Sequence, residues 1–306
     1  MLSFVLTDIN DRKYTLYRPL SVSLLSSADA PADSLRAVFL VDKTDEPLYL
    51  VEALDDNECV FFGEIDSEIH SLSDKGTLLT LTARSRAAVL LDNEAYPQKY
   101  CSPSMPLLMQ RHFIPLGFSK FVGSADAFSG ELDITKGMSE WEVLESFCKR
   151  FLNTSPKITR DGVIDITGSE SSEAIFLNTD SCLSVNRSIF RSSLMSELRL
   201  RARRSGGYEY PIYSALAEKQ RVRRRRFMNT ADNGRSVNDA KTLTEISERR
   251  YRKTEILING RLPAELGTRL FLDGADTGES IREIRYTLDS KGERTLIVTE
   301  GAAECN

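Results

Sequence analysis

The segment Thr77–Asp92, TLLTLTARSRAAVLLD, constrains the fold of this chain more than any other. In its first half, Leu79, Leu81 and Ala83 alternate with residues of the opposite face, which is the two-residue period of a β-strand. After a doubly basic Arg-Ser-Arg turn, the apolar residues take the spacing of a helix. The chain therefore passes directly from a strand with two different faces into a short apolar helix.

The residues before this segment predict a β-domain. Six further short strands are separated by turn-forming residues, and such regular spacing is typical of a barrel or sandwich. The strands are Leu2–Ile9, Lys13–Tyr17, Val22–Leu25, Ala37–Val41, Tyr49–Ala53 and Glu58–Ile69. Gly63 lies in the middle of the longest strand, where it predicts a bulge or bend. We place the first β-barrel domain at residues 1–95.

The middle of the chain predicts a small α/β domain at residues 96–172. Its connector, Tyr96–Pro106, carries three prolines. A helix begins at Ser139, which forms a capping box with Glu142. Trp141, Leu144, Cys148 and Phe151 form the expected core face of this helix, and Glu140, Glu142 and Glu145 its expected solvated face. Strands at Lys157–Thr159 and Val163–Thr167 are expected to form a hairpin around an Asp-Gly turn.

Residues 173–306 return to strands and predict a second β-barrel domain. Near residue 200, Leu198, Leu200 and Ala202 alternate with arginines, which indicates one buried and one basic face. A long polar excursion at about residues 205–235 follows, and a stretch of this length is usually a functional or disordered loop. A helix over Ser236–Tyr251 and a closing hairpin complete the domain. The predicted fold class is mainly β with an α+β part.

Charge is distributed unevenly along the chain. Its formal net charge is −5. Residues 1–92 carry 16 acidic and 8 basic side chains, a net of −8, whereas residues 187–226 carry 12 basic and 3 acidic side chains, a net of +9. Such asymmetry predicts oriented contacts with other macromolecules.

Catalytic and metal-binding motifs are not evident in the sequence. The five cysteines form no CxxC pair, and the N-terminus lacks the features of a signal peptide, so we expect a protein made in a reducing cytoplasm. No apolar run reaches the ~18–20 residues that span a bilayer. The two histidines, His70 and His112, belong to no recognised motif and are expected to be structural or solvated. We predict no cofactor, no metal and no catalytic residues.

Three segments resemble landmarks of the baseplate hub proteins of contractile phage tails and phage-tail-like particles. They are Leu79–Asp92, Thr135–Phe147 with the Asp161-Gly162 hairpin, and the C-terminal course from Asp239 through RLPAELGTRLFLDG to the last hairpin. All three are fold-level patterns. The family often has glycine where Ala83 stands, and the excursion at residues 205–235 lies outside the common pattern.

The resemblance implies a structural adaptor built from two tail-tube-like barrels. Three copies would present six similar units, so that one ring matches a sixfold tail tube on one side and a trimeric central spike on the other. The implied partners are two further copies in a homotrimer, the tail-tube protein, the central spike protein and other baseplate components. DNA or a tape-measure protein would pass through the open ring. The chain would be made in the bacterial cytoplasm and assembled into the baseplate of a virion or tail-like particle.

An arginine-rich patch is the sharpest chemical feature of the sequence. Its members are Arg199, Arg201, Arg203, Arg221, Arg223, Arg224, Arg225 and Arg226. Guanidinium groups bind carboxylates and phosphates, so the patch suits either the acidic first domain of a neighbouring copy or a nucleic acid. A nucleic-acid-binding protein that uses this arm is therefore one alternative function. A tail-associated cell-wall hydrolase that relies on a pair of carboxylates is another.

Overall fold

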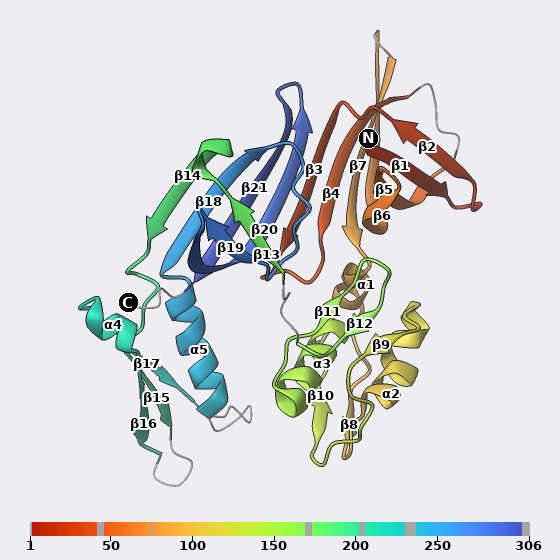
Figure 1. The fold of residues 1–306 in the computed structure, drawn as a ribbon. Helices are drawn as coiled ribbons and strands as arrows, with labels where there is room; N and C mark the ends of the chain where they lie inside the picture. Colours follow the sequence, from red (N-terminus) through yellow and green to blue (C-terminus); the bar gives the residue numbers. More distant parts are fainter. Residues whose placement is uncertain are drawn as a thin grey trace. The chain divides into compact units, whose positions relative to one another are not determined.

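The computed structural model describes residues 2–41, 46–74, 76–168, 173–201, 206–229 and 237–301. Figure 1 shows the fold, which is mainly β with a smaller part of mixed helices and strands. This is the fold class that the sequence predicts. The chain divides into two compact units, Met1–Glu170 with Arg285–Glu293, and Ser171–Ile284 with Arg294–Asn306. The predicted barrel boundaries at residues 95 and 172 stay predictions.

Seven strands form the first β-region, which belongs to the first unit. They are β1 (Leu2–Asp8), β2 (Lys13–Tyr17), β3 (Ser21–Ser27), β4 (Ser34–Val41), β5 (Leu48–Asp55), β6 (Glu58–Ser73) and β7 (Gly76–Ser85). They pair in the order β3-β4-β7-β6-β5-β1-β2. The alternation in Thr77–Ala83 has the predicted effect, because Leu79, Leu81 and Ala83 are all buried in the core of this region with Phe4 and Phe39.

Gly63 has a different role from the one its position suggests. It lies inside regular pairing opposite Ser85, and the irregular step in the β6–β7 register comes later, between Ile65 and Ser67. A Cβ at Gly63 would lie 2.0 Å from the carbonyl oxygen of Arg84. Glycine is needed here because the two backbones approach too closely for any side chain.

The rest of the first unit is the small α/β region. Its elements are α1 (Ala87–Asp92), β8 (Gln98–Tyr100), α2 (Met105–Leu108), a π-helix at Met109–Phe113, a 3-10 turn at Ile114–Leu116, β9 (Phe121–Val122), β10 (Leu132–Ile134), α3 (Glu140–Phe147), a π-helix at Cys148–Leu152, β11 (Lys157–Ile158) and β12 (Ile164–Asp165). The predicted capping box is present, since Ser139 and Glu142 each accept a hydrogen bond from the other's backbone N–H. Helix α3 buries Val143, Leu144 and Phe147 completely.

The second β-region, in the second unit, contains β13 (Ala174–Leu177), a 3-10 turn at Thr179–Ser181, β14 (Cys182–Ile189), β18 (Arg252–Asn259), β19 (Arg269–Leu272), β20 (Ala275–Asp289) and β21 (Gly292–Gly301). Four of the strands pair in the order β14-β18-β21-β20, and β19 joins β20 to β13. Ile256, Leu270, Ile281 and Ile297 form its core. The tip of the β20–β21 hairpin belongs to the first unit, as described below.

A three-stranded sheet occupies the place where we expected a long polar loop. Strands β16 (Tyr208–Tyr213) and β17 (Arg225–Met228) flank β15 (Glu197–Arg201), and α4 (Ala215–Lys219) connects them. The expectation was wrong because the many arginines and glycines made the strand alternation hard to recognise in the sequence. In the structure Ile212 and Met228 align with the apolar residues of β15. Residues 202–205 and 230–236 lie outside the described part of the chain. Helix α5 (Val237–Arg249) follows.

Candidate interaction sites

The arginine-rich patch lies on the sheet β16-β15-β17. Because paired residues share a face, the register places Leu198, Ile212 and Arg226 on one face. On this face Leu198 and Ile212 pack with Leu200, Met228 and Ala240 in a small core. The opposite face carries Glu197, Arg199 and Arg201 from β15, with Arg225 and Phe227 from β17 and Tyr208 and Tyr213 from β16. The predicted alternation of β15 is therefore confirmed from Glu197 to Arg201.

Two arginines of the patch are held by one carboxylate. Glu197 is buried on the basic face of the sheet and forms ion pairs with both Arg225 and Arg199, the latter at 2.5 Å. Hydrogen bonds from Arg225 and Arg199 lower the pKa of Glu197. This acid keeps its charge at neutral pH and fixes the two guanidinium groups against the sheet.

Arg224 stabilises a local turn and is only half-exposed. Its guanidinium donates hydrogen bonds to the carbonyls of Ser192 and Leu194, the second at 3.0 Å. Its backbone N–H also donates to Ser196 Oγ at 2.8 Å. This arginine therefore satisfies backbone groups of the loop before β15 and is a poor candidate for binding a partner.

The remaining arginines of the patch fall into two groups. Arg201 donates to the carbonyl of Gly206 at 3.2 Å, and Arg203 lies outside the described residues. Arg221, Arg223 and Arg226 are exposed. Two aromatic side chains, Tyr213 and Phe227, are exposed on the face of the sheet opposite to Arg226, and Phe227 contacts Tyr208 edge-on with ring centroids 4.8 Å apart. The sequence alone did not distinguish these three exposed arginines from the others.

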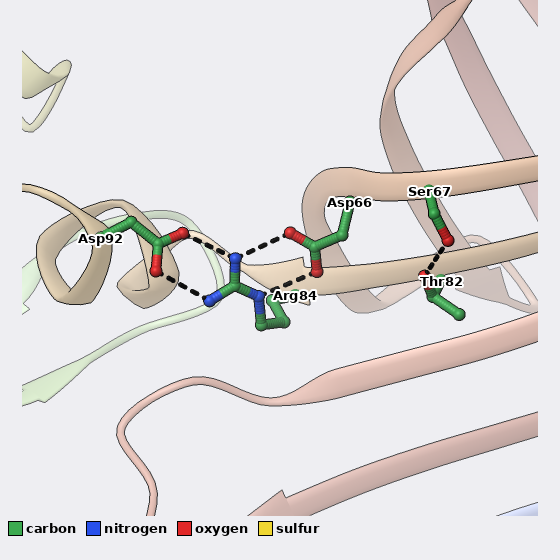
Figure 2. A network of polar contacts seen from close by, with 5 residues as sticks. All are labelled: Asp66, Ser67, Thr82, Arg84 and Asp92. Carbon is green, nitrogen blue, oxygen red and sulfur yellow. Dashed lines mark hydrogen bonds and ion pairs between the residues drawn. The ribbon is translucent and has the colours of Figure 1, made fainter.

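The predicted Arg-Ser-Arg turn is the end of β7 and the N-cap of α1, and Figure 2 shows the contacts of its first arginine, Arg84. Arg84 donates to both oxygens of Asp66 on β6 and to both oxygens of Asp92 at the end of α1, with shortest distances of 2.8 Å and 2.6 Å. These bonds lower the pKa of Asp92 and raise that of Arg84. The arginine joins the long hairpin to the helix that begins the α/β region.

Arg86, the second basic residue of the same turn, points to another part of the unit. It donates to the carbonyl of Gly117 at 3.2 Å and lies 5.3 Å from the ring centroid of Phe118. The pattern that makes this segment recognisable in the sequence therefore reflects a structural junction between the first β-region and the α/β region.

A buried histidine and glutamate correct our expectation for α3. Glu140, which we placed on the solvated face, is buried and lies 2.8 Å from Nδ1 of His112. The other ring nitrogen of His112 is within 3.0 Å of the Tyr100 hydroxyl and 3.2 Å of Gln98. The pair joins three elements of the α/β core, which fits the structural role expected for this histidine. A core-facing glutamate is invisible in sequence because its partner is 28 residues away.

Within the described ranges, no group of three or more His, Cys, Asp or Glu side chains is arranged to hold a metal ion. In those ranges no helix is long and apolar enough to cross a membrane.

Comparison with known proteins rests on structure, because the sequence matches no protein-family model and no curated protein. A 43 kDa tail protein of prophage MuSo2 from Shewanella oneidensis superimposes with a TM-score of 0.81 at 13% identity, covering 99% of both chains. A tail protein of Neisseria meningitidis gives a TM-score of 0.77 at 16% identity, covering 98% of this chain and 96% of that one.

A third similar structure belongs to a secretion system. It is a component of the type VI secretion system of Escherichia coli, itself similar to the T4 bacteriophage tail proteins gp27 and gp5. It gives a TM-score of 0.58 at 11% identity and covers 94% of this chain and 74% of its own. The chain therefore has the fold of phage tail proteins. The resemblance to baseplate hub proteins that we drew from the sequence is confirmed at the level of fold.

Proposed function

We propose that this chain is a structural baseplate hub of a contractile phage tail or tail-like particle, and that it acts as a homotrimer without enzymatic activity. The observation that carries the proposal is the superposition with a prophage tail protein over 99% of both chains. In this role the chain joins a sixfold tail tube to a trimeric central spike, and other baseplate components surround it. It is made in the bacterial cytoplasm and assembles into the particle.

Internal repetition supports the proposed symmetry. The two β-regions each contain a four-stranded series with the same order of connections, β3-β4-β7-β6 and β14-β18-β21-β20. Three copies of a chain with two such regions offer six similar units, which resolves a mismatch between sixfold and threefold partners. The open centre of such a ring leaves a path for DNA or a tape-measure protein.

The charge asymmetry supports a contact between copies. The three exposed arginines Arg221, Arg223 and Arg226 are suited to the acidic first β-region of a neighbour. Their combined replacement by glutamate is the appropriate test, because Arg224 and Arg225 hold local structure. We expect the triple variant to associate at least tenfold more weakly at low salt, and unchanged association would remove these arginines from the interface.

Nucleic-acid binding is a second candidate function, favoured by the exposed Tyr213 and Phe227 on the face of the sheet that also carries Arg199, Arg201 and Arg225. Light-scattering mass on a size-exclusion peak, recorded with absorbance at 260 and 280 nm, distinguishes the two. The hub proposal predicts three times the 34.4 kDa of the chain and no nucleic acid. A monomer that carries salt-sensitive 260 nm absorbance would favour nucleic-acid binding instead.

A further inference from the structure

The two long hairpins of the molecule are built alike. β6 and β20 have 16 and 15 residues, and their partners β7 and β21 have 10 each. The second strand of each hairpin pairs with an inner strand, β4 or β18, and that strand pairs with an outer one, β3 or β14. Strand β14 in the second β-region therefore corresponds to β3 in the first.

The bases of the two hairpins share a close approach of their backbones. A Cβ at Gly63 would lie 2.0 Å from the Arg84 carbonyl oxygen, and a Cβ at Gly301 would lie 2.4 Å from that of Gly278. Each hairpin therefore has at its base a glycine whose Cβ would clash with the backbone of the opposite strand, Gly63 on the first strand of one hairpin and Gly301 on the second strand of the other. This similarity supports the structural correspondence between the two hairpins.

The tip of the β20–β21 hairpin packs within its own chain. Residues Arg285–Glu293 belong to the first unit, and the sheet order places β20 next to β3. Tyr286 is only 5% exposed within the core of the first β-region, and Leu288 packs against the same core. The hairpin thus supplies apolar side chains to the region that carries β3.

The tip of the β6–β7 hairpin also carries apolar side chains, but they are exposed. β5 pairs with β6 only as far as Glu64, so that residues 66–74 extend beyond it. In this tip Ile69 is 55% exposed and Leu72 is 85% exposed. Residues 66–75 contain three acidic side chains and one Lys, and Asp66 is paired with Arg84, so the tip keeps a small net negative charge from Glu68 and Asp74. Exposed apolar side chains on an extended hairpin indicate a binding surface.

Strand β14 carries exposed apolar and basic side chains. It stands at the end of the sheet order, and among the described residues it pairs only with β18. Leu183 and Ile189 on this strand are 56% and 61% exposed. Arg187, between them, is also exposed, and Arg191 follows shortly after. An apolar and basic strand is complementary to an apolar and acidic tip.

We propose that the tip at residues 66–74 packs beside β14 of a second copy of this chain, as Arg285–Glu293 packs beside β3 of its own. The inference rests on the proposed homotrimer and names its contact. The two surfaces differ, so each copy uses its tip on one neighbour and its β14 on the other. Such a head-to-tail contact forms a ring when the rotation closes, and the proposed homotrimer requires that it close after three copies.

Two exposed positions give a direct test. Leu72→Asp places a charge in the tip, and Leu183→Asp places one on β14. We expect each variant alone to elute as a 34.4 kDa monomer in light scattering, with wild-type circular dichroism. Mixed in equal amounts, the variants should form a dimer of twice that mass and nothing larger, because one intact tip meets one intact β14. Tyr96→Asp, at another exposed site in the same unit, is the control and should assemble as the wild type does.

The outcomes separate the inference from the function on which it rests. A wild-type trimer that persists in both single variants overturns the proposed contact and leaves the hub proposal standing. Single variants that are monomeric but fail to form the mixed dimer also overturn it, because the head-to-tail geometry requires that dimer. A wild-type chain that is monomeric at every concentration contradicts the homotrimer, and the contact with it.

Discussion

The two long hairpins have the same pattern of strand pairing, but their tips lie in opposite environments. The tip of β20–β21 is buried in the first unit, where Tyr286 contributes to a core. The tip of β6–β7 leaves Leu72 almost fully exposed. One hairpin tip is therefore buried inside the chain and the other is exposed. Under the proposed contact, the same hairpin design stabilises the fold in one region and the assembly in the other.

The largest expected effect is the loss of stability when a buried side chain of the β20–β21 tip is truncated, compared with an exposed one of the β6–β7 tip. Tyr286→Ala should destabilise the chain by about 3 kcal/mol, because it removes a buried aromatic ring from the first core. Leu72→Ala should change the stability of the monomeric Leu183→Asp background by less than about 0.5 kcal/mol, since its side chain is exposed. Urea denaturation measures both. Equal losses would mean that the two tips are equally buried in one chain.

The next effect tests the close approach at the base of β6–β7. Gly63→Ala should cost about 2 kcal/mol, because the new methyl group meets a backbone carbonyl that cannot move without separating the strands. Thr15→Ala, at an exposed strand position of the same region outside the tip, is the control and should be nearly neutral. Thermal unfolding followed by circular dichroism gives the comparison, and a neutral Gly63→Ala would show that this approach is looser than described.

The base of the second hairpin is held by a buried hydrogen bond. Thr299 Oγ1 donates to Glu279 Oε2 at 2.6 Å, and both residues are buried. Thr299→Val keeps the shape and removes the donor, so we expect a loss of about 1.5 kcal/mol in urea denaturation. Thr299→Ser, which keeps the hydroxyl, should lose less. If the serine variant is the weaker of the two, then packing of the methyl group is what matters.

The smallest effect concerns the exposed ion pairs at the base of the first hairpin. Arg84 lowers the pKa of Asp92 below its ordinary value of 3.8. The native state therefore binds a proton less readily than the unfolded state, and the stability it gains is complete above that value and lost as the pH falls below it. Asp92→Asn should cost at most about 1 kcal/mol at pH 7 and progressively less as the pH falls below 3.8. A cost that is independent of pH would exclude the ion pair as its source.

Much of the fold could be predicted because its strands alternate strictly. The segment Thr77–Ala83 and the capping box at Ser139 each carry a local signal that needs no distant partner. The β15–β17 sheet was hidden because most of its outward residues are arginines and aromatics, which in a sequence look like a loop. Its parallel pairing of β15 with β17 also joins segments nearly 30 residues apart.

The sequence predicted the cluster of arginines, but it could not show which of them are exposed on the surface. Arg224 and Arg225 are indistinguishable from their neighbours in sequence, yet one binds backbone carbonyls and the other Glu197. Likewise Leu72 looks like any core leucine of an alternating strand. Its exposure follows from the length of β6 relative to β5, which only the pairing of the strands reveals.

Electron-microscopy class averages of the purified wild-type chain test the central claim most directly. We predict closed rings with threefold symmetry, an open centre and six similar lobes, two from each copy. Single particles of one copy, or assemblies that pair two copies face to face, would contradict it, because neither arrangement brings a hairpin tip to β14 around a closed ring.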